Sequence, residues 1–157
     1  MCIRDRAWSA QLCGGALQHE SWHLNPQWLL TPSAEAAEFT FVLNQAKQER
    51  MDAIGIWVMV ADRPEGRKTK LVDGQLTAKS KFTHVRQQRL EATLVRRGDG
   101  LPYVLSVATY MPGVQGSFTL TITTNDPGPT VTPIAASDLP AGGGRGALPD
   151  ALSLIHI

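Results

Sequence analysis

Apolar and polar residues alternate with a period of two through the middle of the chain. Between Glu38 and Asn44, two phenylalanines and a leucine fall on one face of an extended chain, and from Ser117 to Thr123 apolar residues alternate with threonines. A period of two is the repeat of a half-buried β-strand and does not produce an apolar stripe along a helix. Residues 54–61 are instead continuously apolar, which is typical of a strand covered on both faces. The pattern therefore predicts β-strands rather than helices.

Turn residues divide the chain into several such strands. Further strands are expected at residues 27–31, 82–90 and 103–110, whereas residues 46–51 are expected to form a turn or a single helical turn. Short clusters containing Gly, Pro or Asp separate the strands. Short strands at near-regular spacing without a long helix predict an all-β, antiparallel sandwich. The expected core residues are Phe39, Phe41, Trp57, Leu105, Phe118 and Leu120.

The two ends of the chain have an unusual relationship at the level of codons. Residues 1–6 and 152–157 can be back-translated into DNA strings that are reverse complements of each other and resemble a transposase mosaic end used in sequencing adapters. We therefore expect these two segments to be translated adapter, and residues 7–126 to form the domain. Residues 127–151 are rich in Pro, Gly and Ala, which predicts a disordered linker. With Cys2 assigned to the adapter, Cys13 is a lone thiol, which favours a reducing, cytoplasmic location.

Two short motifs suggest catalysis, but their surroundings do not support it. Residues 19–23 read His-Glu-Ser-Trp-His, which matches the zinc protease pattern H-E-x-x-H. That chemistry needs both histidines on one face of a helix, and no amphipathic helix frames this copy. Cys13 with a histidine and Asn25 could suggest a cysteine protease triad, but a working triad draws its base from a distant segment. We therefore expect no catalytic residue and no metal ligand in the chain.

Basic residues form the one candidate contact surface. The formal net charge is only +1, which gives no reason to expect a nucleic acid partner. Between residues 63 and 81, however, cations outnumber acids, and this stretch could contact an anionic phospholipid membrane or an acidic partner segment. The alternative is a solvated loop between strands, and that alternative is favoured. The candidate residues are Arg67, Lys68, Lys70, Lys79 and Lys81.

Three ordered blocks of the sequence have a recognisable pattern. The blocks are Gly14-Gly15 with Trp22 and Asn25-Pro26-Gln27, then Val42 to Gln45 with Arg50 to Gly55, then Tyr103 to Leu105 with Thr109 to Leu120. Together they resemble the third domain of calpain-type cysteine proteases. The last block is the most specific, because it is similar to the family pattern Y-V-I-V-P-S-T-F-x-P-G-x-E-G-x-F-x-L. The chain departs from the family because Cys13 precedes the two glycines instead of following them, and because Gln115 replaces a common glutamate.

The resemblance implies an eight-stranded, C2-like β-sandwich that packs beside the papain-like protease core of the same parent chain. It implies a non-catalytic regulatory or interaction domain, because the catalytic Cys, His and Asn of the family lie in the protease core. Calcium could act on the parent protein, but no cofactor is expected here, since Glu65 and Asp73 are too few carboxylates for a calcium site. The alternative is a stand-alone lipid- or protein-binding sandwich adaptor without a protease core.

Overall fold

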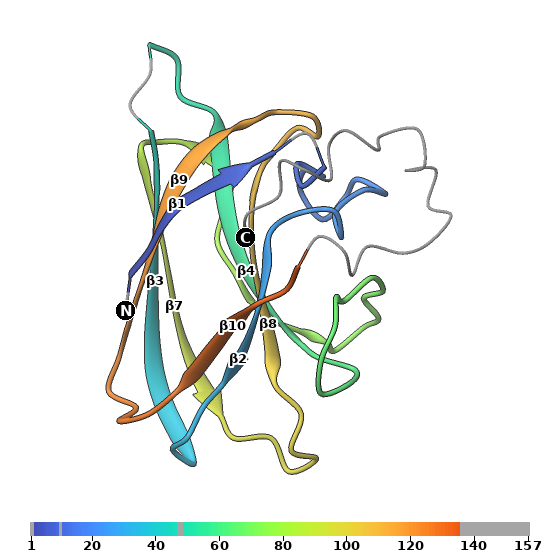
Figure 1. Cartoon of the computed structure of the whole chain (residues 1–157), viewed down its shortest axis with the longest axis vertical. Helices are drawn as coiled ribbons and strands as arrows, with labels where there is room; N and C mark the ends of the chain where they lie inside the picture. Colours follow the sequence, from blue (N-terminus) through green and yellow to red (C-terminus); the bar gives the residue numbers. More distant parts are fainter. Residues whose placement is uncertain (1, 10, 47–48, 136–157) are drawn as a thin grey trace.

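The protein is a two-sheet antiparallel β-sandwich (Figure 1). The computed structural model describes residues 2–9, 11–46 and 49–135. The expected all-β class is confirmed, but the described residues form ten strands rather than eight. One sheet has the order β1-β9-β3-β7, and the other has the order β10-β2-β8-β4-β5, with β6 also paired to β4. The strands are β1 (Cys2–Trp8), β2 (Gln27–Thr31), β3 (Ala36–Gln45), β4 (Ala53–Val60), β5 (Leu76–Lys79), β6 (Thr83–His84), β7 (Gln87–Val95), β8 (Tyr103–Thr109), β9 (Gly116–Thr124) and β10 (Thr130–Pro133).

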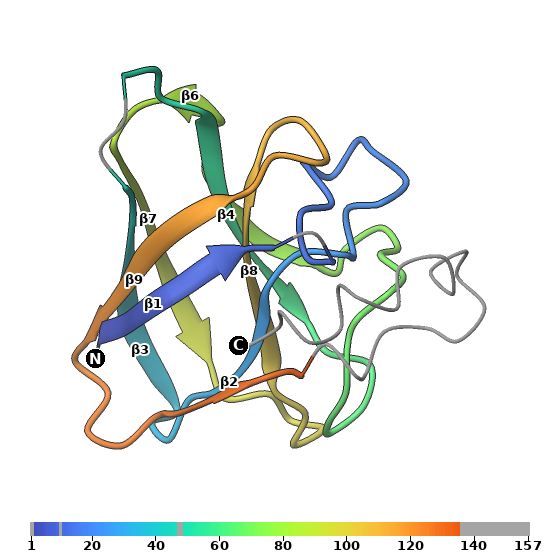
Figure 2. The ribbon, with the colours of Figure 1, turned by 45° about the horizontal axis from the view of Figure 1, so that its top comes forward.

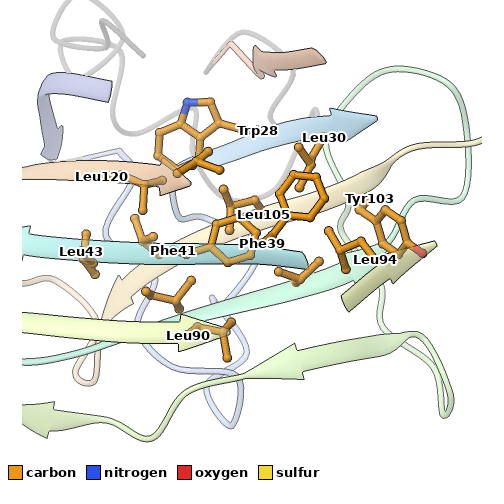
Figure 3. Close-up of a cluster of buried hydrophobic side chains, with 14 of the residues drawn as sticks. Trp28, Leu30, Phe39, Phe41, Leu43, Leu90, Leu94, Tyr103, Leu105 and Leu120 are labelled. Carbon is orange, nitrogen blue, oxygen red and sulfur yellow. The ribbon is translucent and has the colours of Figure 1, made fainter. Parts of the chain in front are cut away.

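The main core lies between the two sheets and follows the alternation of the sequence. In β3 and β9 every second residue is buried, and the register pairs Phe41 with Ile122 and Leu43 with Leu120. Aromatic and leucine side chains from both sheets point toward one another in this space (Figure 3). Each such side chain, when fully buried, contributes about 1.5–3 kcal/mol to folding. The five predicted core residues in this cluster are Phe39, Phe41, Leu105, Phe118 and Leu120.

Trp57, the sixth predicted core residue, is buried in a second cluster on the opposite face of its sheet. There it packs with four other buried residues of β4, β8 and the residue after β4. Two loops, residues 11–26 and 63–75, lie on that side of the sheet (Figure 2) and contribute Leu17, Trp22 and Leu71 to the cluster. This cover explains why β4 and β8 are buried without alternation, as expected for strands covered on both faces.

The segment expected to form one strand at residues 82–90 is divided between the two sheets. Thr83 and His84 form β6 beside β4, while β7 begins at Gln87 and pairs with β3. The chain turns between them, where the Val85 N–H bonds to the Thr83 carbonyl oxygen at 3.0 Å. The expectation of a single strand was therefore wrong, because the segment is where the chain crosses from one sheet to the other.

Three further strands were not expected. β5 lies within the basic stretch, and β10 lies within the expected linker, where Ile134 is also buried. The disordered linker was therefore wrong for residues 130–134, and residues 136–151 lie outside the described part of the chain. β1 includes residues 2–6, which were assigned to adapter, and its backbone pairs with β9. The turn expected at 46–51 includes residues 47–48, which also lie outside the described residues.

Within the described residues, no helix has the length and apolar character needed to cross a bilayer.

Candidate functional site

A long loop before β2 is held together by one buried side chain, that of Asn25. Its Oδ1 accepts a hydrogen bond from the Gly14 N–H at 3.0 Å. Its Nδ2 donates to the carbonyl oxygens of Gly15 and Trp22, both at 2.8 Å. Buried backbone groups outside a sheet need such partners, because leaving them unpaired is costly. Asn25 therefore fixes the loop against the sheet.

This loop meets two other segments at one end of the sandwich. The Gly113 N–H bonds to the Cys13 carbonyl oxygen at 2.7 Å, and the Ala16 N–H bonds to that of Tyr110 at 3.0 Å. The Tyr110 N–H in turn bonds to the Ala53 carbonyl oxygen at 2.7 Å. Gly15 has a φ of 82°, and a Cβ there would lie 2.8 Å from the Pro112 backbone nitrogen, so the contact requires glycine. Three segments that are far apart in the sequence therefore meet at this end of the sandwich.

A mainly apolar groove of about 360 Å³ opens at this end, and we call it the Tyr110 groove. Two of its large apolar side chains are open to solvent, since Tyr110 is 39% and Met111 55% exposed. The Tyr110 ring is supported by edge contacts to Phe82 and to His19, each with ring centroids 5.7 Å apart. The groove is lined by Arg50, Met51, Asp52, Ala53, His84, Thr109, Tyr110, Met111 and Val114.

Hydrogen bonds hold the His84 ring and the Asp52 backbone in place. His84 Nδ1 lies 3.0 Å from the Met51 carbonyl oxygen, and the Asp52 N–H donates to Gln45 Oε1 at 3.3 Å. No group of three or more His, Cys, Asp or Glu side chains in the described residues is arranged to hold a metal ion. The groove can receive an apolar side chain, and the exposed side chains of Arg50 and His84 lie beside it.

The two catalytic-looking motifs lie in turns. Residues 19–23 form no helix, and their histidines contact different rings, His19 that of Tyr110 and His23 that of Trp22. The Asn25 amide, which a triad would need, is bonded to backbone groups of the loop. The local sequence around the motif predicted this outcome, since Gly14-Gly15 and Asn25-Pro26 flank it.

The five residues of the predicted basic surface do not share one environment, because some are buried and others are exposed. Arg67 is 1% and Lys68 3% exposed, so neither can reach a membrane. The Arg67 guanidinium donates to the Asn25 carbonyl oxygen at 2.6 Å, and Lys68 Nζ lies 2.9 Å from Asp62 Oδ2. Burial of Arg67 joins the loop 63–75 to the first loop, because a buried charge needs hydrogen-bond partners around it. The exposed members of the set are Lys70, Lys79 and Lys81.

Two carboxyl groups have lowered pKa values, and both lie away from the groove. Desolvation acts to raise the pKa of Asp126, but hydrogen bonds from the Ser33 hydroxyl and from the N–H groups of Gly128, Ala34 and Ser33 outweigh it and lower the pKa to about 2. The hydrogen bond from Lys68 is the main cause that lowers the pKa of Asp62, against some desolvation. Both groups therefore stay ionised and serve to fix loops.

The sequence reasoning did not select the groove residues as a site. The signal was present, since an exposed Tyr-Met pair directly follows the buried strand β8 and precedes the Pro112-Gly113 turn. In comparisons with known proteins, no family model matches the chain, and no curated protein matches it.

Proposed function

We propose that the chain is a non-catalytic interaction domain that binds an apolar segment of a neighbouring domain in the Tyr110 groove. One observation carries the proposal: residues of the second and third blocks that resemble the calpain domain line this groove together. The loop of the first block bonds to the backbone of Tyr110 and Gly113 beside it. An exposed aromatic and methionine at the mouth of a groove are typical of protein contacts.

The resemblance supports a specific neighbour. In calpain-type proteases the third domain packs beside the papain-like core, so we propose that the neighbour is a protease core of the same parent chain. The parent would be an intracellular, cytoplasmic cysteine endopeptidase, and calcium would act on the parent rather than on this domain. Peptide bond cleavage would belong to the core.

The binding test uses the protease core that the proposal places in the same parent chain. Isothermal titration of that core with the domain should show binding, and Tyr110→Ala with Met111→Ala should weaken it about tenfold or more, as for central anchors of an interface. Val72→Ala is the matched control, because Val72 is 61% exposed on a different loop. Equal binding by the groove variant would reject the proposed site. Casein hydrolysis by the purified domain, lost on Cys13→Ser, would reject a non-catalytic domain.

A membrane-binding adaptor is the second candidate, and the exposed lysines favour it. Lys79 lies on β5, Lys81 follows that strand, and Lys70 lies in the loop before it. Replacing Lys70, Lys79 and Lys81 by Gln should abolish sedimentation with vesicles that contain phosphatidylserine, because each cation near an anionic surface contributes about 1 kcal/mol. Lys68 is left intact because it is buried. If the triple variant binds these vesicles as the unchanged protein does, the lysines do not form a membrane site.

A further inference from the structure

β7 is the last strand of its sheet in the described part of the chain. It is nine residues long and contains no proline. Residues at even positions from Gln88 to Leu94 face inward, and those at odd positions are exposed. A long edge strand presents unpaired N–H and C=O groups that can pair with another strand. The exposed side chains of β7 therefore determine which strand fits there.

We propose that β7 pairs antiparallel with β7 of a second copy of this chain, about a two-fold axis at Leu90. The two four-stranded sheets would then form one continuous sheet. In such an isologous contact, a residue before Leu90 in one copy lies opposite the residue equally far after Leu90 in the other. The two side chains project from the same face of the sheet. This surface is distinct from the Tyr110 groove.

The charges of β7 match this register. Arg89 lies opposite Glu91 of the second copy, and Glu91 lies opposite its Arg89, so two opposite-charge pairs form. Both side chains are available, because they are 62% and 67% exposed and form only a solvent-exposed ion pair within the chain. An axis at Arg89 or at Glu91 would instead place like charges opposite each other, which is destabilising. The charges therefore favour Leu90 over these two neighbouring registers.

One further feature fits the same register. A hollow of about 280 Å³, lined by Glu38, Glu91 and their neighbours on β3 and β7, lies where the arginine of the second copy would enter.

The inner side of β7 is held by its own chain. Gln88 Nε2 donates to the carbonyl oxygens of Lys81 at 2.8 Å and Ile54 at 3.2 Å, which ties β7 to the opposite sheet. Pairing with a second copy would leave these bonds intact and would use the backbone edge and the outward side chains. We therefore expect a weak dimer, because a single strand edge buries less surface than a standard interface.

Sedimentation velocity of the full chain from micromolar to millimolar concentration tests the proposal. The unchanged protein should move from monomer toward dimer, whereas Arg89→Glu and Glu91→Arg should each raise the dissociation constant about tenfold, because each places like charges opposite each other twice. The double variant, Arg89→Glu with Glu91→Arg, should restore the original constant.

Circular dichroism and urea unfolding of every variant check that the monomer is folded. We expect every variant to fold, because the side chains of Arg89 and Glu91 are exposed. A protein that stays monomeric throughout the range would overturn the proposal. So would a double variant that associates no better than the single ones.

Discussion

Side-chain amides replace missing strand partners at several buried positions. Gln27 shows this most clearly: its Nε2 donates to the Lys68 carbonyl oxygen and its Oε1 accepts from the Lys68 N–H, both at 2.9 Å. One side chain thus imitates a paired residue of a β-ladder. Gln45 does the same between two segments, donating to the carbonyl oxygens of Asp52 at 2.8 Å and Val85 at 2.6 Å. These residues are buried because they complete backbone hydrogen bonding.

Gly14 allows the closest backbone approach in the first loop. A Cβ there would lie 1.9 Å from the Ser21 carbonyl oxygen, so Gly14→Ala must displace the loop that Asn25 holds. We expect a loss of about 3 kcal/mol in the free energy of unfolding, measured by urea denaturation. Gly98→Ala is the control, because a Cβ there meets nothing within 4 Å, and its effect should stay within about 0.5 kcal/mol. Equal effects would contradict the assigned loop packing.

Lys68 and Lys70 are two residues apart but should respond differently to the same change. Lys68 Nζ bonds to Asp62 Oδ2 and to Gln75 Oε1, both at 2.9 Å, while Lys70 is exposed. Lys68→Met should lower the free energy of unfolding by about 1–3 kcal/mol, because it leaves the Asp62 and Gln75 acceptors without their cation. Lys70→Met should be nearly neutral. If thermal and urea unfolding rank the two variants the other way, the burial of Lys68 is wrong.

At the scale of the strands, β10 completes a sheet edge and carries an apolar anchor. It pairs with β2 from Thr130 to Pro133, and the following Ile134 is 3% exposed. The Ile134 N–H bonds to the Gln27 carbonyl oxygen at 2.9 Å, and its own carbonyl oxygen accepts from Arg67 at 3.4 Å. The segment 130–134 therefore joins the loop 63–75 to β2.

Truncation tests this role of β10. A chain that ends at Pro129 loses the ladder with β2 and the buried Ile134. Its free energy of unfolding should therefore be about 3 kcal/mol lower than that of the full chain. A chain that ends at Ala135 keeps every described contact of β10 and should match the full chain in urea denaturation. Equal stability of the two truncated chains would show that β10 contributes nothing.

The sequence predicted strands where the local pattern was sufficient and missed them where it was not. β2, β3, β4, β8 and β9 each have a clear alternating or continuous apolar pattern, and they were found within one or two residues. β5 and β10 are short, polar and flanked by Pro or Gly, so their strand character comes from their neighbours in the sheet.

The candidate site was less predictable than the fold. The Tyr110 groove depends on hydrogen bonds between segments that are far apart in sequence, such as Ala16 to Tyr110 and Tyr110 to Ala53. Likewise, no local pattern distinguishes the buried Lys68 from the exposed Lys70, because the difference arises from Asp62 and Gln75. The charge run was visible in the sequence, whereas the partners that bury half of it were not.

At the scale of the whole molecule, acid should loosen the contact between the ends of β2 and β9. Asp126, two residues after β9, accepts from the N–H groups of Ser33 and Ala34, two and three residues after β2. Its pKa is lowered from 3.8 to about 2 in the folded protein, so the unfolded chain binds the proton more readily. The stabilisation is therefore complete above about pH 4 and is lost as pH falls toward 2.

Urea denaturation at several pH values tests this dependence. Between pH 5 and pH 3, which spans about the ordinary pKa of an aspartate, Asp126→Asn should lose less stability than the unchanged protein. Asp73→Asn, in an exposed turn, should keep the original profile. A parallel loss in all three proteins would mean that Asp126 is not the group responsible.

The two apolar clusters on either side of β4 also give the molecule built-in optical reporters. Trp8 and Trp28 lie between the sheets, whereas Trp57 lies beneath the covering loops. Indole emission shifts to longer wavelength when water reaches the ring, so a variant that retains Trp57 alone would report detachment of the loops, and one that retains Trp28 alone would report separation of the sheets. Different midpoints for the two signals would show that the covering loops melt as a unit of their own.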